Sequence, residues 1–119
     1  MTARQPTPSE IRVSKDKRTM TLAWPGREQQ ELSAEYLRVH SPSAEVQGHR
    51  PSDRKTQFGK RDVEIRNIQL VGNYAIKITF SDGHDTGLFS WTYLAELSEQ
   101  KDEKWAAHLK ELEEKGLPR

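Results

Sequence analysis

The sequence predicts a small α+β domain: an antiparallel β-sheet built of hairpins, with short helices and a C-terminal amphipathic helix. Apolar and polar residues alternate along residues 74–80, as in a strand with one face on a core. Asp82-Gly83 follows this strand, and Asp-Gly is among the strongest short-range signals of a hairpin. Apolar residues then recur at helical spacing within residues 91–97 and 105–112.

The first third of the chain predicts three strands. Residues 10–13 and 19–24 alternate apolar and polar side chains and are separated by a charged turn, so we expect a hairpin. Pro25-Gly26 is a turn dipeptide, and residues 28–32 are expected to form a short third strand.

A short helix is expected over residues 34–39, because Ser33 can cap its N-terminus. Pro42 disfavours helix at the residue before it and so ends this element. Residues 41–62 have no hydrophobic period and are rich in proline, glycine, serine and charge. A loop of this length is usually functional or disordered.

The next predicted strand covers residues 63–70. Its apolar phase slips by one between Ile65 and Ile68, which indicates a β-bulge near Arg66-Asn67. Gly72-Asn73 fits a two-residue turn. The central strand is then expected to place four side chains on the core: Tyr74, Ile76, Ile78 and Phe80.

The C-terminal third predicts two helices. Ser90 can cap a helix that begins at Trp91. A second helix over residues 101–114 ends at Gly116, and we expect its stripe of Trp105, Leu109 and Leu112 to dock on the sheet. The predicted organisation is a flexible tail (1–8), a domain (9–97) with a mobile loop (41–62), and a C-terminal helix and tail (98–119).

Size and composition restrict the class of protein. A chain of 119 residues with 33% hydrophobic and 31% charged residues is expected to form one polar domain. Its net charge of +1 argues against bulk attraction to nucleic acid or membranes. The lack of cysteine excludes disulfides, thiolate metal sites and cysteine nucleophiles. No secretory signal or membrane-spanning run is found, so we expect a monomeric cytoplasmic protein.

The histidines are the natural candidates for metal binding. Zinc is held by four nitrogen, sulfur or oxygen ligands, and His40, His49 and His84 with Asp82 or Asp85 could supply them. We favour the interpretation that they are loop histidines at the solvent edge, because no pair has metal-ligand spacing on one element. An iron oxygenase is not expected, because the sequence has no His-x-Asp or His-x-Glu triplet.

A basic cluster with one aromatic residue is the candidate binding surface. Its members are Arg50, Arg54, Lys55, Phe58, Lys60 and Arg61. Cations with an exposed aromatic ring could follow a nucleic-acid backbone and stack a base. Because carboxylates are interspersed, a solvated loop is the preferred interpretation, and a protein partner is expected rather than nucleic acid.

Several segments, in their order along the chain, resemble a known family. They are Pro8 and Ile11, Leu22-Ala23-Trp24-Pro25-Gly26, Leu32, Tyr36-Leu37-Arg38, Ile76, Phe80-Ser81-Asp82-Gly83-His84, Phe89-Ser90-Trp91 and Leu94. The sequence is similar to a small bacterial domain that also forms the N-terminal domain of gamma-butyrobetaine hydroxylase and trimethyllysine hydroxylase. A similar domain is appended to some P-loop iron–sulfur scaffold ATPases. The resemblance implies a small α+β domain of antiparallel strands and short helices.

In the hydroxylases the resemblance also implies a zinc site of three cysteines and a later histidine. Ser41, Ser43 and Val46 stand where the cysteines would be, and His84 matches the fourth ligand. One such ligand cannot hold zinc, so we expect the site to be lost, with His40 as the only neighbouring replacement. The oxygenase domain of the hydroxylases has no counterpart in these residues.

Two functional hypotheses follow. The first is a non-catalytic binding or adaptor domain whose contact surface joins the Ser41–Asp62 loop to the Asp82–His84 turn. The second is a metal-binding accessory domain for iron or iron–sulfur handling that uses His84, His40 and His49. An independent enzyme is not expected, because no convergent cleft of titratable groups can be assembled.

Overall fold

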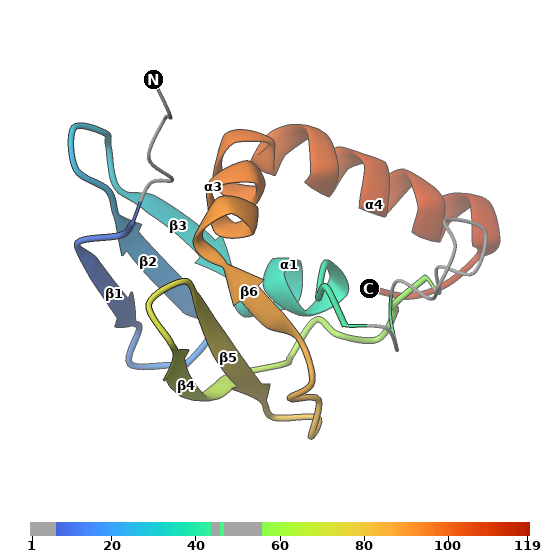
Figure 1. Cartoon of the computed structure of the whole chain (residues 1–119). Coiled ribbons are helices and arrows are strands. Elements are labelled where there is room, and N and C mark those ends of the chain that lie inside the picture. The colour runs from blue at the N-terminus through green and yellow to red at the C-terminus, as the bar shows by residue number, and fades with distance from the viewer. Residues whose placement is uncertain (1–6, 44–45, 47–55) are drawn as a thin grey trace.

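The computed structural model describes residues 7–43, 46 and 56–119 (Figure 1). The regular elements follow in chain order: β1 (Glu10–Val13), β2 (Thr19–Ala23), β3 (Gln30–Ser33), α1 (Ala34–Val39), β4 (Ile65–Val71), β5 (Ala75–Phe80), β6 (Leu88–Ser90), α3 (Trp91–Glu99) and α4 (Lys101–Lys115). The predicted α+β class, the antiparallel hairpins and the C-terminal helix are confirmed.

The strands form two antiparallel sheets of three strands each, in the orders β1-β2-β3 and β4-β5-β6, rather than one sheet. The chain leaves the first sheet through α1, so β3 and β4 are not neighbours (Figure 1). A backbone hydrogen bond of 2.7 Å from Ile65 N–H to the Lys17 carbonyl joins the two sheets at one corner. One hydrophobic core contains side chains from both sheets and from α1 and α3.

The central strand β5 lies where the alternation predicts. Ile76, Ile78 and Phe80 are all buried in the core. The prediction for Tyr74 is wrong, because this side chain is 53% exposed and belongs to the turn before β5. Val71 pairs with Ala75, which leaves three turn residues rather than two.

The Asp82-Gly83 turn is present, but it does not join β5 to β6 directly. Phe80 N–H donates to the His84 carbonyl, and Gly83 N–H donates to the Phe80 carbonyl, each at 3.0 Å. β6 begins only at Leu88, so residues 81–87 form a longer connection than the predicted tight hairpin. This loop carries the polar side chains of the candidate site.

Local signals at the element ends are confirmed. Ser33 and Ser90 cap α1 and α3 by accepting hydrogen bonds at 3.0 and 3.1 Å from backbone N–H groups in the first turn of each helix. The ladder between β4 and β5 shifts register between Ile65 and Asn67, where the bulge was expected. The third strand begins two residues later than predicted, at Gln30.

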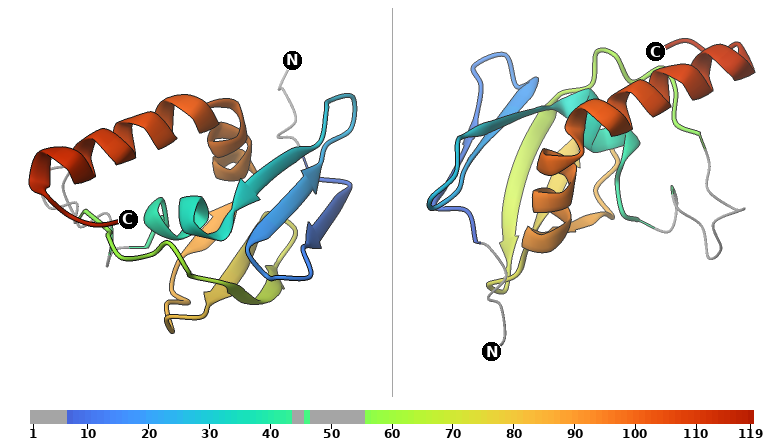
Figure 2. Two further views of the ribbon diagram at one scale, coloured as in Figure 1. Left: turned by 180° about the vertical axis from the view of Figure 1, so that it is seen from behind. Right: turned by 90° about the horizontal axis from the view of Figure 1, so that it is seen from above.

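The C-terminal helix packs differently from the prediction. α4 runs alongside α1 instead of lying on a sheet (Figure 2), and the Trp105 ring contacts the Tyr36 ring of α1 with centroids 6.3 Å apart. His108 is buried, whereas Leu109 is 37% exposed, so histidine replaces the predicted leucine on the inner face. Among the described residues, no helix is long and apolar enough to cross a membrane.

Candidate functional site

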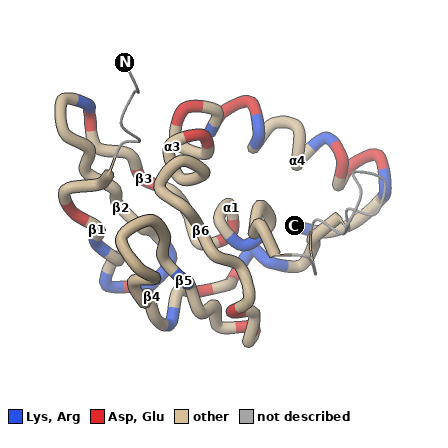
Figure 3. The backbone as a smooth tube through the Cα atoms, viewed as in Figure 1, with Lys and Arg blue, Asp and Glu red and all other residues tan. Residues whose placement is uncertain are grey.

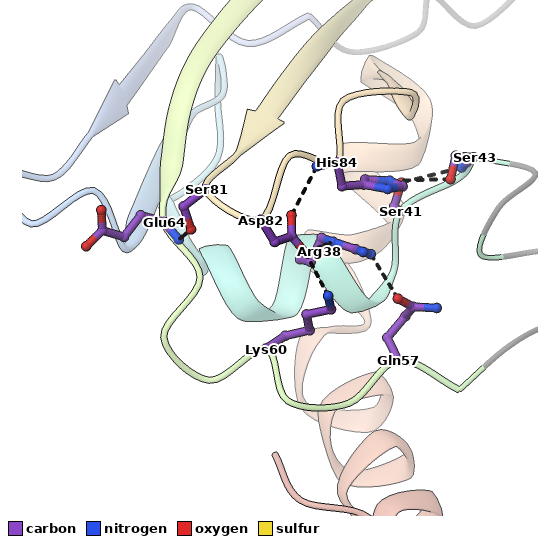
Figure 4. Close-up of polar contacts among 9 residues, drawn as sticks. All are labelled: Arg38, Ser41, Ser43, Gln57, Lys60, Glu64, Ser81, Asp82 and His84. Carbon is purple, nitrogen blue, oxygen red and sulfur yellow. Dashed lines mark hydrogen bonds and ion pairs between the residues drawn. The ribbon is translucent and has the colours of Figure 1, made fainter.

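Asp82 is the centre of a polar cluster that joins the β5–β6 loop to two other segments. Its Oδ2 accepts hydrogen bonds from Arg38 Nε at 2.8 Å and from Lys60 Nζ at 2.7 Å (Figure 4). Its Oδ1 accepts one from the backbone N–H of His84 at 3.1 Å. The carboxylate therefore connects α1, the turn after β5 and the segment that precedes β4.

These contacts keep Asp82 ionised. Partial burial would by itself raise the pKa of the carboxyl, but hydrogen bonds from Lys60, from the His84 backbone and from Arg38 outweigh that effect. The pKa of Asp82 falls from 3.8 to about 2 as a result. Across the physiological range the cluster thus contains one carboxylate between two cations.

Arg38 is held in an almost buried position. Its side chain is only 9% exposed, because α1 is buried over its whole length. Nη1 donates a further hydrogen bond of 3.1 Å to the Gln57 side chain, so the guanidinium has partners on two segments. A buried guanidinium without a carboxylate would be costly, and this makes Asp82 the main determinant of its position.

A second polar group lies on the other side of the same turn. His84 Nε2 is hydrogen-bonded to Ser41 Oγ at 2.8 Å and lies 3.4 Å from Ser43 Oγ (Figure 4). All three side chains are buried. A Cβ atom at Gly87 would collide with Ser41 Oγ, so the close approach of the two segments requires glycine at this position.

Ser41 and Ser43 stand at two cysteine positions, and His84 at the histidine position, of the zinc site that the family resemblance implies for the hydroxylases. The structure brings them together, and Val46, at the remaining position, is buried. The residues do not fit zinc, because two hydroxyls, one imidazole and an aliphatic side chain do not provide its usual ligand set. No group of three or more His, Asp or Glu within the described ranges is arranged to hold a metal ion.

The other predicted metal ligand, His40, lies in a different environment. Its Nδ1 is hydrogen-bonded to the Tyr36 carbonyl at 2.9 Å, and its ring contacts that of His108 with centroids 6.2 Å apart. His40 therefore takes part in the packing of α4 on α1. His49 lies outside the described residues.

The structure describes half of the predicted basic cluster. Phe58 and Arg61 are exposed, and Lys60 is bound to Asp82. Arg50, Arg54 and Lys55 lie outside the described residues. The predicted surface thus includes one cation that contacts the Asp82–His84 turn.

Sequence reasoning missed the pairing partners Arg38 and Gln57 and the packing role of Gly87. All residues of the helix that carries Arg38 are buried. A buried arginine requires a hydrogen-bond acceptor, so the charge of Arg38 was the one sequence signal that pointed to a pairing partner.

The fold and this polar cluster define a small α+β domain in which a loop between two strands is attached to the end of a helix. Residues 11–95 match the family described as gamma-butyrobetaine hydroxylase-like, N-terminal. This chain therefore belongs to that family. A comparison with curated proteins gave no match.

Several solved structures are similar to this chain, and three of them are described below. One protein with an NMR solution structure has 47% sequence identity and a TM-score of 0.85, over 98% of this chain and 91% of its own. A second NMR structure has 37% identity and a TM-score of 0.81, over 100% and 90%. A crystal structure of a protein of unknown function of the DUF971 family from Acidithiobacillus ferrooxidans has 36% identity and a TM-score of 0.63, over 79% and 92%.

Proposed function

We propose that this protein is a non-catalytic binding or adaptor domain. Its contact surface joins the turn at Asp82–His84 to the segment around Lys60. The observation that carries the proposal is the Asp82 cluster, because it holds this turn and this segment together at an exposed edge of the fold. We further propose a cytoplasmic monomer that binds a protein rather than nucleic acid.

The chemistry of the cluster supports binding over catalysis. The pKa of Asp82 is lowered to about 2, so its carboxylate is a poor proton acceptor near neutral pH. His84 is buried and hydrogen-bonded to Ser41. Groups held in this way position a surface rather than exchange protons with a substrate.

Arg61 and Phe58 give this surface features that a partner can recognise. Both are exposed and lie on the segment that Lys60 attaches to the turn. Arginine and aromatic residues are enriched at protein interfaces. We therefore expect a partner with acidic and apolar groups.

The test is capture of a partner by immobilised protein from bacterial extract, quantified by mass spectrometry. The double variant Arg54→Ala with Lys60→Ala should retain less of any protein that the wild type captures. A matched control, Arg27→Ala with Lys110→Ala, removes the same two charge types elsewhere on the surface. Equal capture by all three proteins would exclude this surface, provided that the unfolding curves show all three to be folded.

Metal binding by His84, His40 and His49 is the alternative proposal, for a role in iron or iron–sulfur handling. Titration of zinc or iron, followed through the histidine ring signals by NMR, separates the two functions. Movement of the His84 ring signals near stoichiometric metal would favour the alternative. Unchanged signals at that ratio would leave the binding domain as the explanation of the cluster.

A further inference from the structure

A groove of about 410 Å³ opens between β1 and β4, the outer strands of the two sheets. Aliphatic side chains of both strands line it: Ile11, Val13, Ile65, Ile68 and Leu70. β1 is hydrogen-bonded to β2 and β4 to β5, and each strand is at the edge of its sheet. The groove therefore lies between two strand edges. Apart from Ile65 N–H, which donates to the Lys17 carbonyl, their outward backbone groups can pair with a further strand.

The exposure of Leu70 shows that the apolar surface here is incompletely covered. Its register partner on β5 is Ile76, which is fully buried. Cross-strand partners lie on the same face of a sheet, so Leu70 is on the face that forms the core. It is nevertheless 68% exposed. The core-facing side of the second sheet thus extends beyond the cover that the first sheet provides.

The charges at this groove have one sign. Lys17 and Arg66 both line it and are exposed. Within the described part of the chain, neither side chain makes an ion pair, whereas nearby Arg12 and Arg18 pair with carboxylates. Figure 3 shows basic positions gathered where β1 and β4 approach each other. A ligand of this groove should therefore carry negative charge beside its apolar part.

We propose that the groove binds an extended segment of a partner protein as an added β-strand. The segment would have aliphatic side chains at every second position and a carboxylate near Lys17 or Arg66. Alternation is required because successive side chains of a strand point to opposite faces, so one set enters the groove and the other faces water. Strand addition of this kind takes its affinity from main-chain hydrogen bonds and its specificity from the pocket.

This site is separate from the surface proposed above. It is formed by β1 and β4, whereas the Asp82 cluster joins α1 and the turn after β5. One site can therefore fail a test without affecting the other.

A synthetic peptide tests the proposal directly. The probe is acetyl-Asp-Val-Thr-Val-Thr-Val-Asp-amide, titrated into the full-length ¹⁵N-labelled protein. We expect amide shifts concentrated in β1 and β4. Leu70→Glu should weaken binding about tenfold or more, because it places a carboxylate in the apolar part of the groove. Leu88→Glu is the matched control, since Leu88 is an exposed leucine on β6 and does not line the groove.

The charge part of the proposal has its own variant. Arg66→Glu should weaken binding of the acidic peptide several-fold. It should strengthen binding of a peptide of the same sequence with lysine in place of aspartate at both ends. An absence of shifts in β1 and β4 at about millimolar peptide would overturn the proposal. So would equal binding by Leu70→Glu and the wild type, or binding of a small apolar probe but no peptide. A concentration-dependent dimer that Leu70→Glu abolishes would assign the groove to a second copy and overturn it as well.

Discussion

Replacing Asp82 by asparagine should destabilise the protein mainly by removing one charge. Asparagine has nearly the same shape and can still accept a hydrogen bond, so the turn should keep its conformation. The guanidinium of Arg38 then remains almost buried without its carboxylate, and Lys60 loses its counter-ion. Leaving a buried charge unpaired is the expensive part of breaking such a pair.

The lowered pKa of Asp82 gives the size of the expected loss in the free energy of unfolding. A fall from 3.8 to about 2 corresponds to about 2 kcal/mol of stability at neutral pH. The Asp82 side chain is 25% exposed, and screening by water reduces this figure to about 1 kcal/mol. For a chain of this size, that change lowers the melting temperature by about 4 °C.

The dependence on pH distinguishes loss of the charge from a general defect. A carboxyl whose pKa is lowered by folding stabilises the native state above its unfolded pKa. That contribution is lost as the pH falls through the folded value. The wild type should thus be more stable than Asp82→Asn at pH 5–7, and the difference should shrink below about pH 4 and be lost only below about pH 2.

Denaturant unfolding followed by tryptophan fluorescence measures this difference, because Trp24 and Trp91 are buried. Asp85→Asn is the matched control in the same loop, since Asp85 forms no hydrogen bond or ion pair with the described residues. The reasoning is refuted if both variants are equally stable, or if the difference between wild type and Asp82→Asn is as large at pH 2 as at pH 7.

Three further predictions concern the same region of the fold. Gly87→Ala should lower the free energy of unfolding by about 2 kcal/mol, because its Cβ would displace the Ser41 side chain; chemical denaturation measures this, and an unchanged midpoint would contradict the contact. Tyr36→Phe should cost about 1 kcal/mol in the same assay through loss of a buried 2.7 Å hydrogen bond to an α3 carbonyl, and a neutral result would argue against that bond. Ser41→Cys, Ser43→Cys and Val46→Cys together should create a zinc site with the existing histidine, detected as near-stoichiometric zinc after dialysis, whereas the wild type serves as the control.

The sequence predicted those features of the fold that local signals determine. The alternation along Ile76, Ile78 and Phe80 has period two because one face of β5 lies on the core. Ser33 and Ser90 were identified as caps because a hydroxyl at that position accepts a backbone hydrogen bond within a few residues. Each of these signals is contained in a short window, so long-range packing did not alter them.

Features that depend on contacts distant in sequence could not be predicted in the same way. Arg38 and Asp82 are 44 residues apart, and no pattern in either segment specifies the other. The division into two sheets depends on how α1 redirects the chain, which periodicity does not report. Tyr74 continues the alternation of β5 perfectly, yet the turn geometry places it in solvent.

The polar cluster explains how the loop at residues 81–87 keeps one conformation without pairing as a strand. Asp82 and His84 lie two residues apart and contact different segments, Arg38 and Lys60 in one case and the serines after α1 in the other. Each of these hydrogen bonds contributes only about 1–3 kcal/mol net, so the loop should open locally at a lower free energy than the core strands. A surface held by a few such bonds is ordered enough to be recognised and still able to adjust to a partner. This is the physical reason to look for binding at the Asp82 cluster rather than for a reaction.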